Sequence, residues 1–358
     1  MKVCILGDGL TSLTFAKALV NKGIVVDIFS NKNNKNRNIT DKIRTIGISK
    51  SNIEFLNKDI LNIEKFLWDI NKIEIYSESS INEKILNFND NNQRLFSIVK
   101  NYKLKDYFLS DLKKNKFINF KKNINFELIK KDYKLIINCD PNNVITKKFF
   151  HNKINKNYKS NAYVTIINHK RIENNTAIQI FTNKGPLAFL PISKNETSIV
   201  YSIRGLQKID LLKLIKKYNK KYQILKIIDP KSFKIYSSNL RSYHYKNILA
   251  FGDLLHKLHP HAGQGFNMTL RDIREILDLI DVKIKNGLEL DSSICIDFEK
   301  KRRHTNYLFS QGIDFLYEFF KFESEINNYT LNKTIKFLGK NQIINKLATK
   351  FANKGIIV

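Results

Sequence analysis

The chain has 358 residues, of which 42% are hydrophobic, enough for a sizeable core, and this composition argues against a disordered or fibrous protein. The 62 lysines and arginines outnumber the 33 acidic residues. The basic residues are spread along the chain, and no helix-turn-helix, zinc-finger or RNA-recognition signature accompanies them, so no nucleic-acid partner is expected.

The three cysteines, Cys4, Cys139 and Cys295, show no CxxC spacing. This argues against a disulfide framework and a zinc site, and it fits a reducing cytoplasm. The first apolar run is cut short by Gly7, unlike a signal peptide. No run approaches ~18 apolar residues, so no transmembrane helix is expected.

The first thirty residues predict a β-α-β unit: a strand over Lys2–Leu6, a glycine turn, a helix closed by Gly23, and a strand over Val25–Phe29. Gly7 permits the tight turn, and Gly9 lets the backbone approach a pyrophosphate. The helix start at Leu10 then offers free N–H groups to the phosphates. The alternative is an ordinary strand–turn–helix without a ligand.

Two positions depart from the dinucleotide-binding pattern. Ser12 stands where a third glycine is usual, and Ser30 stands where an acidic residue would bind a ribose. Asp27 is nearby but lies inside the strand, so we do not expect it to substitute. Ser30 or Asn31 would then bond the ribose, and more weakly.

The segment Phe251–Asp272, FGDLLHKLHPHAGQGFNMTLRD, follows an apolar strand over residues 247–250. Pro260 to Gly265 is expected to be a turn, with a helix beginning at Phe266. Asp253 is placed at a strand end, where its carboxylate can accept hydrogen bonds from a polyol.

The glycines of this turn allow backbone N–H groups to approach a flat ring or a phosphate. Gly263 and Gly265 supply that freedom, while Gln264 and Asn267 can bond the edge of a heterocycle. The helix start adds a positive field that would favour a reduced, anionic cofactor.

This segment resembles the GD motif of class A flavoprotein monooxygenases, the p-hydroxybenzoate hydroxylase fold, and within it the ubiquinone-biosynthesis hydroxylases. The matching positions are Gly252, Asp253, His256, His259, Pro260, Gly263, Gln264, Gly265, Asn267 and Asp272. The resemblance implies that Asp253 binds the ribitol of FAD and that the loop from Pro260 to Asn267 passes the isoalloxazine.

Shorter stretches support the resemblance. The run 41–49 is similar to a family segment in which Arg44 would contact FAD; a surface arginine is the alternative. Asp140 matches the family's DG motif, where Pro141 replaces the glycine, and Lys100 replaces an acidic residue. The run 185–192 resembles the family's GPLALLP strand and would bring Pro191 near the ring being oxidised; an edge strand with a proline is the alternative.

The resemblance and the glycine turns together give the expected FAD contacts: Gly7, Gly9, Leu10, Ser30, Arg44, Asp140, Gly252, Asp253, Pro260, Gly263, Gln264, Gly265, Phe266 and Asn267. His259, Pro260 and Pro191 are expected beside the reacting atoms, with His259 as a candidate proton shuttle.

His256, His259 and His261 could also suggest a metal site. The loop offers no cysteine or carboxylate cluster to complete one, so no metal is expected. For His256 we expect a hydrogen-bonded side chain that organises the loop.

The predicted fold class is α/β. A Rossmann-like FAD-binding domain (1–65, 91–150 and 241–285) carries an inserted β-sheet substrate domain (66–90 and 151–240). A C-terminal helical region follows over 286–358. Its last predicted helix, capped by Asn341 and ended by Gly355, is basic and amphipathic. It is expected on an anionic membrane surface, and a surface helix packed on the core is the alternative.

The implied function is an FAD- and NAD(P)H-dependent monooxygenase. It would hydroxylate a polyprenylated phenol with O2 in ubiquinone biosynthesis through a flavin C4a-hydroperoxide. It would work in the cytoplasm, peripheral to the inner membrane, with other ubiquinone-biosynthesis proteins as further partners. Two alternatives remain: a related FAD oxidoreductase acting on isoprenoids, and a non-catalytic subunit of a ubiquinone-biosynthesis complex, which Ser12, Ser30, Lys100 and Pro141 motivate.

Overall fold

The computed structural model describes residues 1–30, 42–78, 84–89, 94–122, 129, 131–205, 210–258 and 263–326. His259, Pro260, His261, Asn31 and the expected helix over 341–355 lie outside the described residues. Two sheets of different kinds dominate the described part, a mostly parallel one toward the N-terminus and a mostly antiparallel one.

The first sheet is Rossmann-like and has the strand order β16-β17-β9-β1-β2-β8. Its strands are β1 (Lys2–Leu6), β2 (Val25–Phe29), β8 (Ile118–Lys121), β9 (Ile136–Asn138), β16 (His244–Tyr245) and β17 (Ile248–Ala250). The pairs β1–β2, β1–β9, β9–β17 and β2–β8 are parallel, as expected for buried, near-continuous apolar strands.

Helices pack around this sheet and complete the larger core. They are α1 (Leu10–Asn21), α3 (Lys50–Phe55), α4 (Asn101–Leu112), α6 (Val144–Phe149) and α8 (Gln264–Lys285). Short π and 3₁₀ turns follow at η1 (Leu56–Ile60) and η2 (Glu64–Phe66). The predicted β-α-β start is confirmed, including the end of α1, where Gly23 has a φ of 72°.

The second sheet has the order β18-β15-β10-β13-β12-β11-β5-β6, with β14 pairing β10. Its strands are β5 (Lys72–Ser77), β6 (Lys84–Asn89), β10 (Lys153–His169), β11 (Thr176–Thr182), β12 (Gly185–Pro191), β13 (Glu196–Arg204), β14 (Ile224–Ile227), β15 (Lys231–Leu240) and β18 (His256–Lys257). Strands β12 and β13 pair in antiparallel orientation. Helix α7 (Leu211–Tyr218) covers one face with its own apolar cluster.

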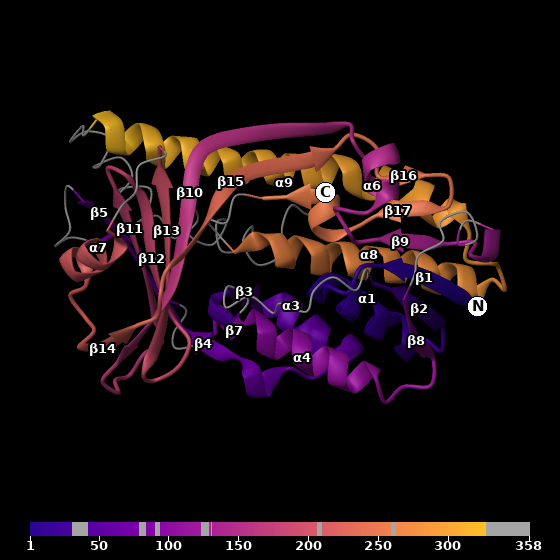
Figure 1. The fold of residues 1–358 in the computed structure, drawn as a ribbon, viewed down its shortest axis with the longest axis horizontal. Coiled ribbons are helices and arrows are strands. Elements are labelled where there is room, and N and C mark those ends of the chain that lie inside the picture. The colour runs from indigo at the N-terminus through magenta and orange to yellow at the C-terminus, as the bar shows by residue number, and fades with distance from the viewer. Residues whose placement is uncertain are drawn as a thin grey trace.

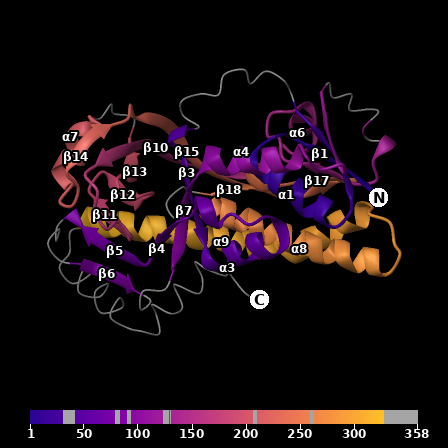
Figure 2. The ribbon, with the colours of Figure 1, turned by 90° about the horizontal axis from the view of Figure 1, so that it is seen from below.

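A three-stranded sheet, β3-β7-β4, lies between the two larger ones. Its strands are β3 (Thr45–Ser49), β4 (Trp68–Ile70) and β7 (Phe96–Lys100). Figure 1 shows the long ribbon of β10 and β15 joining the two halves of the molecule. Helix α9 (Ser292–Ile326) runs along both halves and packs against α8 (Figure 2).

Helix α8 begins at Gln264 rather than at Phe266, so the expectation that Gln264 and Gly265 lie in a turn was wrong. Gly263 takes a φ of 58° and turns the chain directly into the helix.

The domain limits drawn from the sequence stay a prediction. Strand β18 belongs to residues assigned to the FAD-binding domain, yet it pairs with β15 of the second sheet. No described helix is long and apolar enough to cross a membrane.

Candidate cofactor site

Three loops meet at one edge of the first sheet because β1, β9 and β17 run parallel and end there. They carry Gly7, Asp140 and Gly252. A methyl group on Gly7 would lie 3.4 Å from Cβ of Asp140, and one on Gly252 would lie 2.8 Å from Cγ2 of Thr11. The sequence-predicted residues of these loops are therefore brought together.

The start of α1 offers a site for an anion. Gly7 has a φ of 104°, Gly9 precedes the helix, and the first turn that begins at Leu10 holds no acidic residue. A Cβ on Gly9 would meet nothing within 4 Å, so its backbone is open to a ligand. Ser12 is buried against Gly7 and fills the place of the third glycine.

Asp27, the acidic residue nearest to the second departure at Ser30, is engaged inside the sheet. It is fully buried and accepts hydrogen bonds from Asn119 (2.8 Å) and Tyr133. Burial alone would raise the pKa of Asp27, but these bonds and those from Lys121 and Lys2 outweigh it and lower the pKa to about 2. Half-buried Ser30 directly follows the end of β2, and its bond to a ribose stays a prediction.

The loop after β9 is stabilised by side chains that the sequence analysis did not single out. Asn138 is fully buried, bonds the Thr146 hydroxyl at 2.9 Å, and accepts from the Asn143 side chain at 2.7 Å. The Asp140 carboxylate accepts a hydrogen bond from Asn142 N at 2.9 Å, which stabilises the turn. The sequence signal that could have identified this network is Asn138, a polar residue at the end of an otherwise apolar strand. This network supports the turn although Pro141 has no N–H.

Asp253 lies at the end of β17 in a 3₁₀ turn (η4, Gly252–Leu254) opened by Gly252 at a φ of 65°. It is exposed and has no hydrogen-bond or ion-pair partner among the described residues. Burial raises the pKa of the neighbouring Cys139 thiol to about 12, and the charges of Asp140 and Asp253 act in the same direction. The two carboxylates thus flank one point of the sheet edge.

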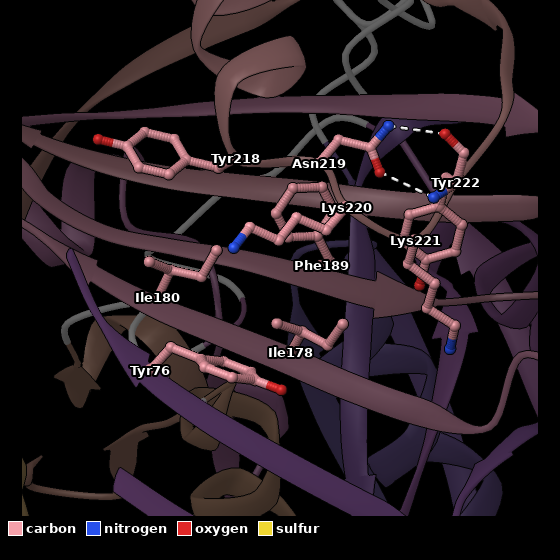
Figure 3. Close-up of a pocket in the computed structure, with 9 residues that line it drawn as sticks. All are labelled: Tyr76, Ile178, Ile180, Phe189, Tyr218, Asn219, Lys220, Lys221 and Tyr222. Atoms are coloured by element: carbon pink, nitrogen blue, oxygen red, sulfur yellow. Dashed lines mark hydrogen bonds between the residues drawn. The ribbon is translucent and has the colours of Figure 1, made fainter. Parts of the chain in front are cut away.

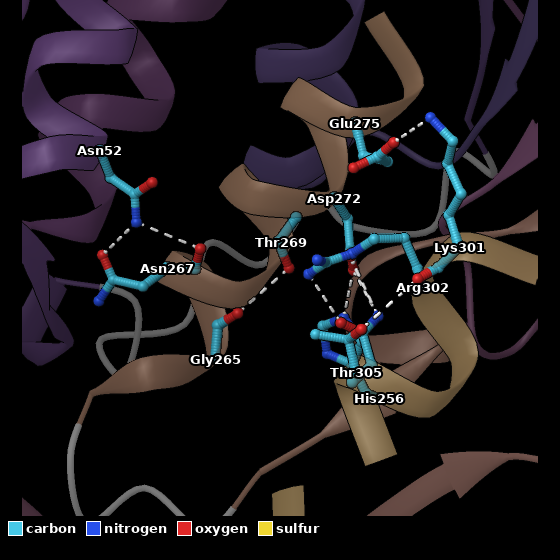
Figure 4. Close-up of polar contacts among 11 residues, drawn as sticks. Asn52, His256, Gly265, Asn267, Thr269, Asp272, Glu275, Lys301, Arg302 and Thr305 are labelled. Carbon is cyan, nitrogen blue, oxygen red and sulfur yellow. Dashed lines mark hydrogen bonds and ion pairs between the residues drawn. The ribbon is translucent and has the colours of Figure 1, made fainter. Parts of the chain in front are cut away.

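The start of α8 is fastened to β3 by one side chain. Asn267 accepts from Ser49 N at 2.9 Å and donates to the Gly47 carbonyl at 2.9 Å. It also accepts from the Asn52 side chain at 3.0 Å (Figure 4) and donates to the Gly263 carbonyl at 3.2 Å. Asn267 bonds protein on all sides, so the structure favours a positioning role over direct contact with a flavin.

The other residues of this segment differ in exposure. Gln264 is buried and accepts from Arg271 at 3.4 Å, whereas Gly265 and Phe266 are half-buried. A Cβ on Gly263 would lie 3.6 Å from Gly47 N, so the loop passes close to β3. Arg44 stands just before β3, is exposed, and has no side-chain partner among the described residues.

His256 belongs to a buried polar network, as expected for a side chain that organises the loop. Its Nε2 bonds Asp272 at 2.6 Å, and Asp272 also accepts from Arg302 at 2.8 Å and Asn306 at 3.0 Å (Figure 4). Burial alone would raise the pKa of Asp272, but the charge of Arg302 and the His256 bond outweigh it and lower it. The network ties β18, α8 and α9 together.

Pro191 is directed away from the first sheet. It pairs with Thr197, on the face where Phe189 packs under α7. Leu190 and Ile192 face the opposite side, in the cluster shared with β4 and β7. A role of Pro191 beside the reacting ring stays a prediction, and it would have to use the backbone carbonyl.

No protein-family model matches the chain. The chain is similar to 3-demethoxyubiquinol 3-hydroxylase of Escherichia coli, 24% identical over 49% of this chain and 47% of the relative. It is also similar to ubiquinone hydroxylase UbiL of Rhodospirillum rubrum (26%, covering 46% and 41%) and to the human mitochondrial ubiquinone biosynthesis monooxygenase COQ6 (25%, covering 51% and 49%). The chain spans about half the length of the curated relatives it matches.

The similarity to solved structures extends over nearly the whole chain. The p-nitrophenol 4-monooxygenase PnpA of Pseudomonas putida superposes with a TM-score of 0.79 at 11% identity, covering 99% and 98% of the two chains. HpxO of Klebsiella pneumoniae, solved with FAD and uric acid, gives a TM-score of 0.70 at 12% identity, covering 99% and 97%. The expected α/β fold class is confirmed, because the chain shares its fold with these two solved structures over nearly its whole length.

Proposed function

We propose that this chain is an FAD-dependent monooxygenase that hydroxylates the aromatic ring of a polyprenylated phenol in ubiquinone biosynthesis. The observation that carries the proposal is the gathering of the Gly7, Asp140 and Gly252 loops, with the exposed Asp253, at one sheet edge. The similarity to several ubiquinone hydroxylases supports the choice of substrate class.

The residues present fit an FAD molecule. The open backbone at Gly9 and the start of α1 suit a pyrophosphate, and the free carboxylate of Asp253 suits the hydroxyls of the ribityl chain. Exposed Arg44 adds a positive charge on the β3 side. Bound FAD would supply oxygen transfer to the ring, using O2 and electrons from NAD(P)H.

The protein itself would position the elements around the cofactor and exclude water from the site. Asn267 fixes the start of α8 against Gly47, which directs the positive end of the helix along the β3 side of the site. The cluster of Ile70, Ile98 and Ala177 seals the contact between the middle sheet and the second sheet. Proton transfer by His259 and a contact from Pro260 remain part of the proposal.

Replacing Asp253 tests the cofactor assignment. We expect Asp253→Ala to lose most of its bound FAD, because it removes an acceptor that no described residue replaces. Asp229→Ala, which alters an exposed carboxylate before β15, should keep it. The visible absorbance of purified protein reconstituted with FAD measures the difference. A folded wild-type chain that takes up no FAD would refute the enzyme and favour a non-catalytic subunit.

A second measurement separates the two enzyme candidates. FAD-loaded protein is incubated with a polyprenylphenol, NAD(P)H and ¹⁸O₂, and the product is analysed by mass spectrometry. We expect one labelled oxygen in the ring. NAD(P)H consumption without label in any product would instead indicate a related FAD oxidoreductase acting on isoprenoids.

An anionic membrane surface is the proposed location of the reaction, on the inner face of the inner membrane, because a polyprenyl tail keeps the substrate in the bilayer. The net charge of +29 supports this. We expect the protein to float with vesicles containing an anionic lipid and to be released by high salt. Equal binding to neutral vesicles would contradict an electrostatic contact. Other ubiquinone-biosynthesis proteins are proposed as partners at that surface.

A further inference from the structure

A pocket of about 260 Å³ lies on the α7 side of the second sheet (Figure 3). Its floor is made by Tyr76 of β5, by Ile178 and Ile180 of β11, and by Phe189 of β12. Its wall is the segment 218–222, which includes the end of α7. The volume is just below the roughly 300–1,000 Å³ typical of ligand pockets, which suits a molecule with one ring.

The sheet itself separates this pocket from the candidate cofactor site. Phe189 pairs with Ile178 and shares its face, which is the pocket face. The next residue, Leu190, pairs with Ser198, and the Ser198 hydroxyl bonds Thr45 of β3 at 2.9 Å on the opposite face. A molecule in the pocket would therefore occupy a second, distinct site.

The pocket is lined with aromatic rings and has a fixed wall. The rings of Phe189 and Tyr222 are nearly parallel, with centroids 6.0 Å apart and an angle of 19°. Asn219 donates to the Tyr222 carbonyl at 2.7 Å and accepts from Tyr222 N at 2.8 Å, which closes the turn (Figure 3). The wall is thus pre-formed, and flat aromatic surfaces favour a planar ligand.

The charge around the pocket is positive. Among the described residues, Glu74 pairs with Lys72 at 2.9 Å and Lys84 at 2.7 Å, and Glu78 is bonded by Lys217 and Tyr218. The turn adds Lys220 and Lys221, and the charges of Glu74 and Glu173 act on Lys221, so the lysines outnumber these carboxylates. Figure 3 shows the Lys220 side chain reaching over the floor toward Ile180. A ligand with a negative group at its end would find compensation there.

We propose that this pocket is a second binding site, which takes a small planar aromatic carboxylate. The ring lies on the isoleucine floor beside Phe189 and Tyr222, and the carboxylate faces the lysines of the turn. The proposal does not rest on the proposed enzymatic function, because none of these residues belongs to the candidate cofactor site.

The protein carries its own reporter for this site. Trp68 is the one tryptophan in the sequence, and its Nε1 donates to the Asn174 carbonyl at 2.6 Å. The Asn174 side chain accepts from the Tyr222 hydroxyl at 3.0 Å. A ligand that shifts Tyr222 therefore acts on the tryptophan through one residue, and Trp68 fluorescence should change on binding.

The test is a titration of the full chain with benzoate, followed by Trp68 fluorescence and by calorimetry. We expect saturable binding of one benzoate per chain and much weaker binding of neutral benzyl alcohol. The double variant Lys220→Met/Lys221→Met should weaken benzoate binding by about tenfold, because it removes charge-assisted hydrogen bonds. Lys216→Met, a change at an exposed α7 lysine outside the pocket lining, should leave it unchanged.

Two further variants make the outcome decisive. Ile180→Phe should abolish binding by filling the floor, and Asp253→Ala should bind benzoate normally even without FAD. Benzyl alcohol binding as tightly as benzoate, or equal benzoate affinity in the wild type and the lysine double variant, would overturn the proposal. Loss of binding in Asp253→Ala would place the benzoate in the cofactor site and overturn it as well.

Discussion

Gly252 shows how one missing side chain can determine the geometry of a loop. Its φ of 65° is in the left-handed region, and a Cβ there would lie 2.8 Å from Cγ2 of Thr11. Gly23, at the end of α1, has a similar φ of 72° but has open space where its Cβ would be. A substitution at Gly252 therefore meets both backbone strain and a steric clash, whereas a substitution at Gly23 meets backbone strain alone.

We expect Gly252→Ala to lower the free energy of unfolding by about 2–4 kcal/mol, combining left-handed strain with overpacking. Gly23→Ala should cost only about 1–2 kcal/mol, because strain acts alone. Urea unfolding measures both losses of free energy. Adding Thr11→Ala should recover part of the loss in Gly252→Ala but none of the loss in Gly23→Ala. Equal losses at the two glycines would show that the contact with Thr11 is unimportant.

Asp27 predicts a dependence of stability on pH. Its folded pKa of about 2 lies below the ordinary value of 3.8, so the unfolded chain takes up the proton more readily. The stabilisation is fully present above about pH 4 and is lost as the pH falls toward about 2. Urea unfolding from about pH 6 down to about pH 3 should show this decline, and Asp27→Asn should flatten it. An unchanged slope in Asp27→Asn would assign the decline to other carboxylates.

At the scale of elements, α8 is held by two side chains on different turns. Asn267 fastens its first turn to β3 and α3, and Asp272 fastens its third turn to α9 and β18. Because the candidate site uses the start of α8, the distance between α8 and β3 depends on residues that do not touch a cofactor.

The Asp272 network is expected to contribute strongly to stability. Asp272→Asn leaves Arg302 without its buried counter-charge and should cost about 3–5 kcal/mol. Asp281→Asn on the same helix removes a carboxylate that bonds Lys22 at 2.6 Å but is 39% exposed, and it should cost at most about 1 kcal/mol. Denaturant midpoints with matched slopes give the comparison. Similar losses in both variants would mean that the buried network adds nothing beyond a surface pair.

At the scale of the whole molecule, polar contacts around an apolar centre join the middle sheet to the second sheet. Thr45 of β3 bonds Ser198 of β13, and Lys100 of β7 bonds both carboxylate oxygens of Glu196 at 2.9 Å. Lys100 stands where the ubiquinone-biosynthesis hydroxylases that this sequence resembles have an acidic residue. Its ion pair with Glu196 gives that replacement a structural reason. The position therefore serves the joint between sheets.

Exchanging the charges of this pair tests the joint. Lys100→Glu and Glu196→Lys should each destabilise the protein, since each places like charges together, whereas Lys100→Glu/Glu196→Lys should recover most of the loss. A double-mutant cycle in urea should give a coupling of about 1 kcal/mol for this partly buried pair. Additive losses without recovery would show that the two side chains do not interact in solution.

The sequence by itself determined the β-α-β start, the strand and helix around Gly252, and the strand over residues 185–191. Each rests on a local signal: a glycine turn, a period of two or 3.6 residues, or a short connection. These signals were enough to indicate the fold, since the order of such elements selects a small number of architectures.

Only the tertiary structure decided which side chains are already bonded to protein. Asn267 contacts Ser49 and Gly47 across more than two hundred residues, and the sequence did not predict these bonds. The pocket beside α7 exists because β5 pairs with β11 from a distant part of the chain. Such contacts carry no local signal, because they depend on how finished elements pack and on which polar groups burial obliges to pair.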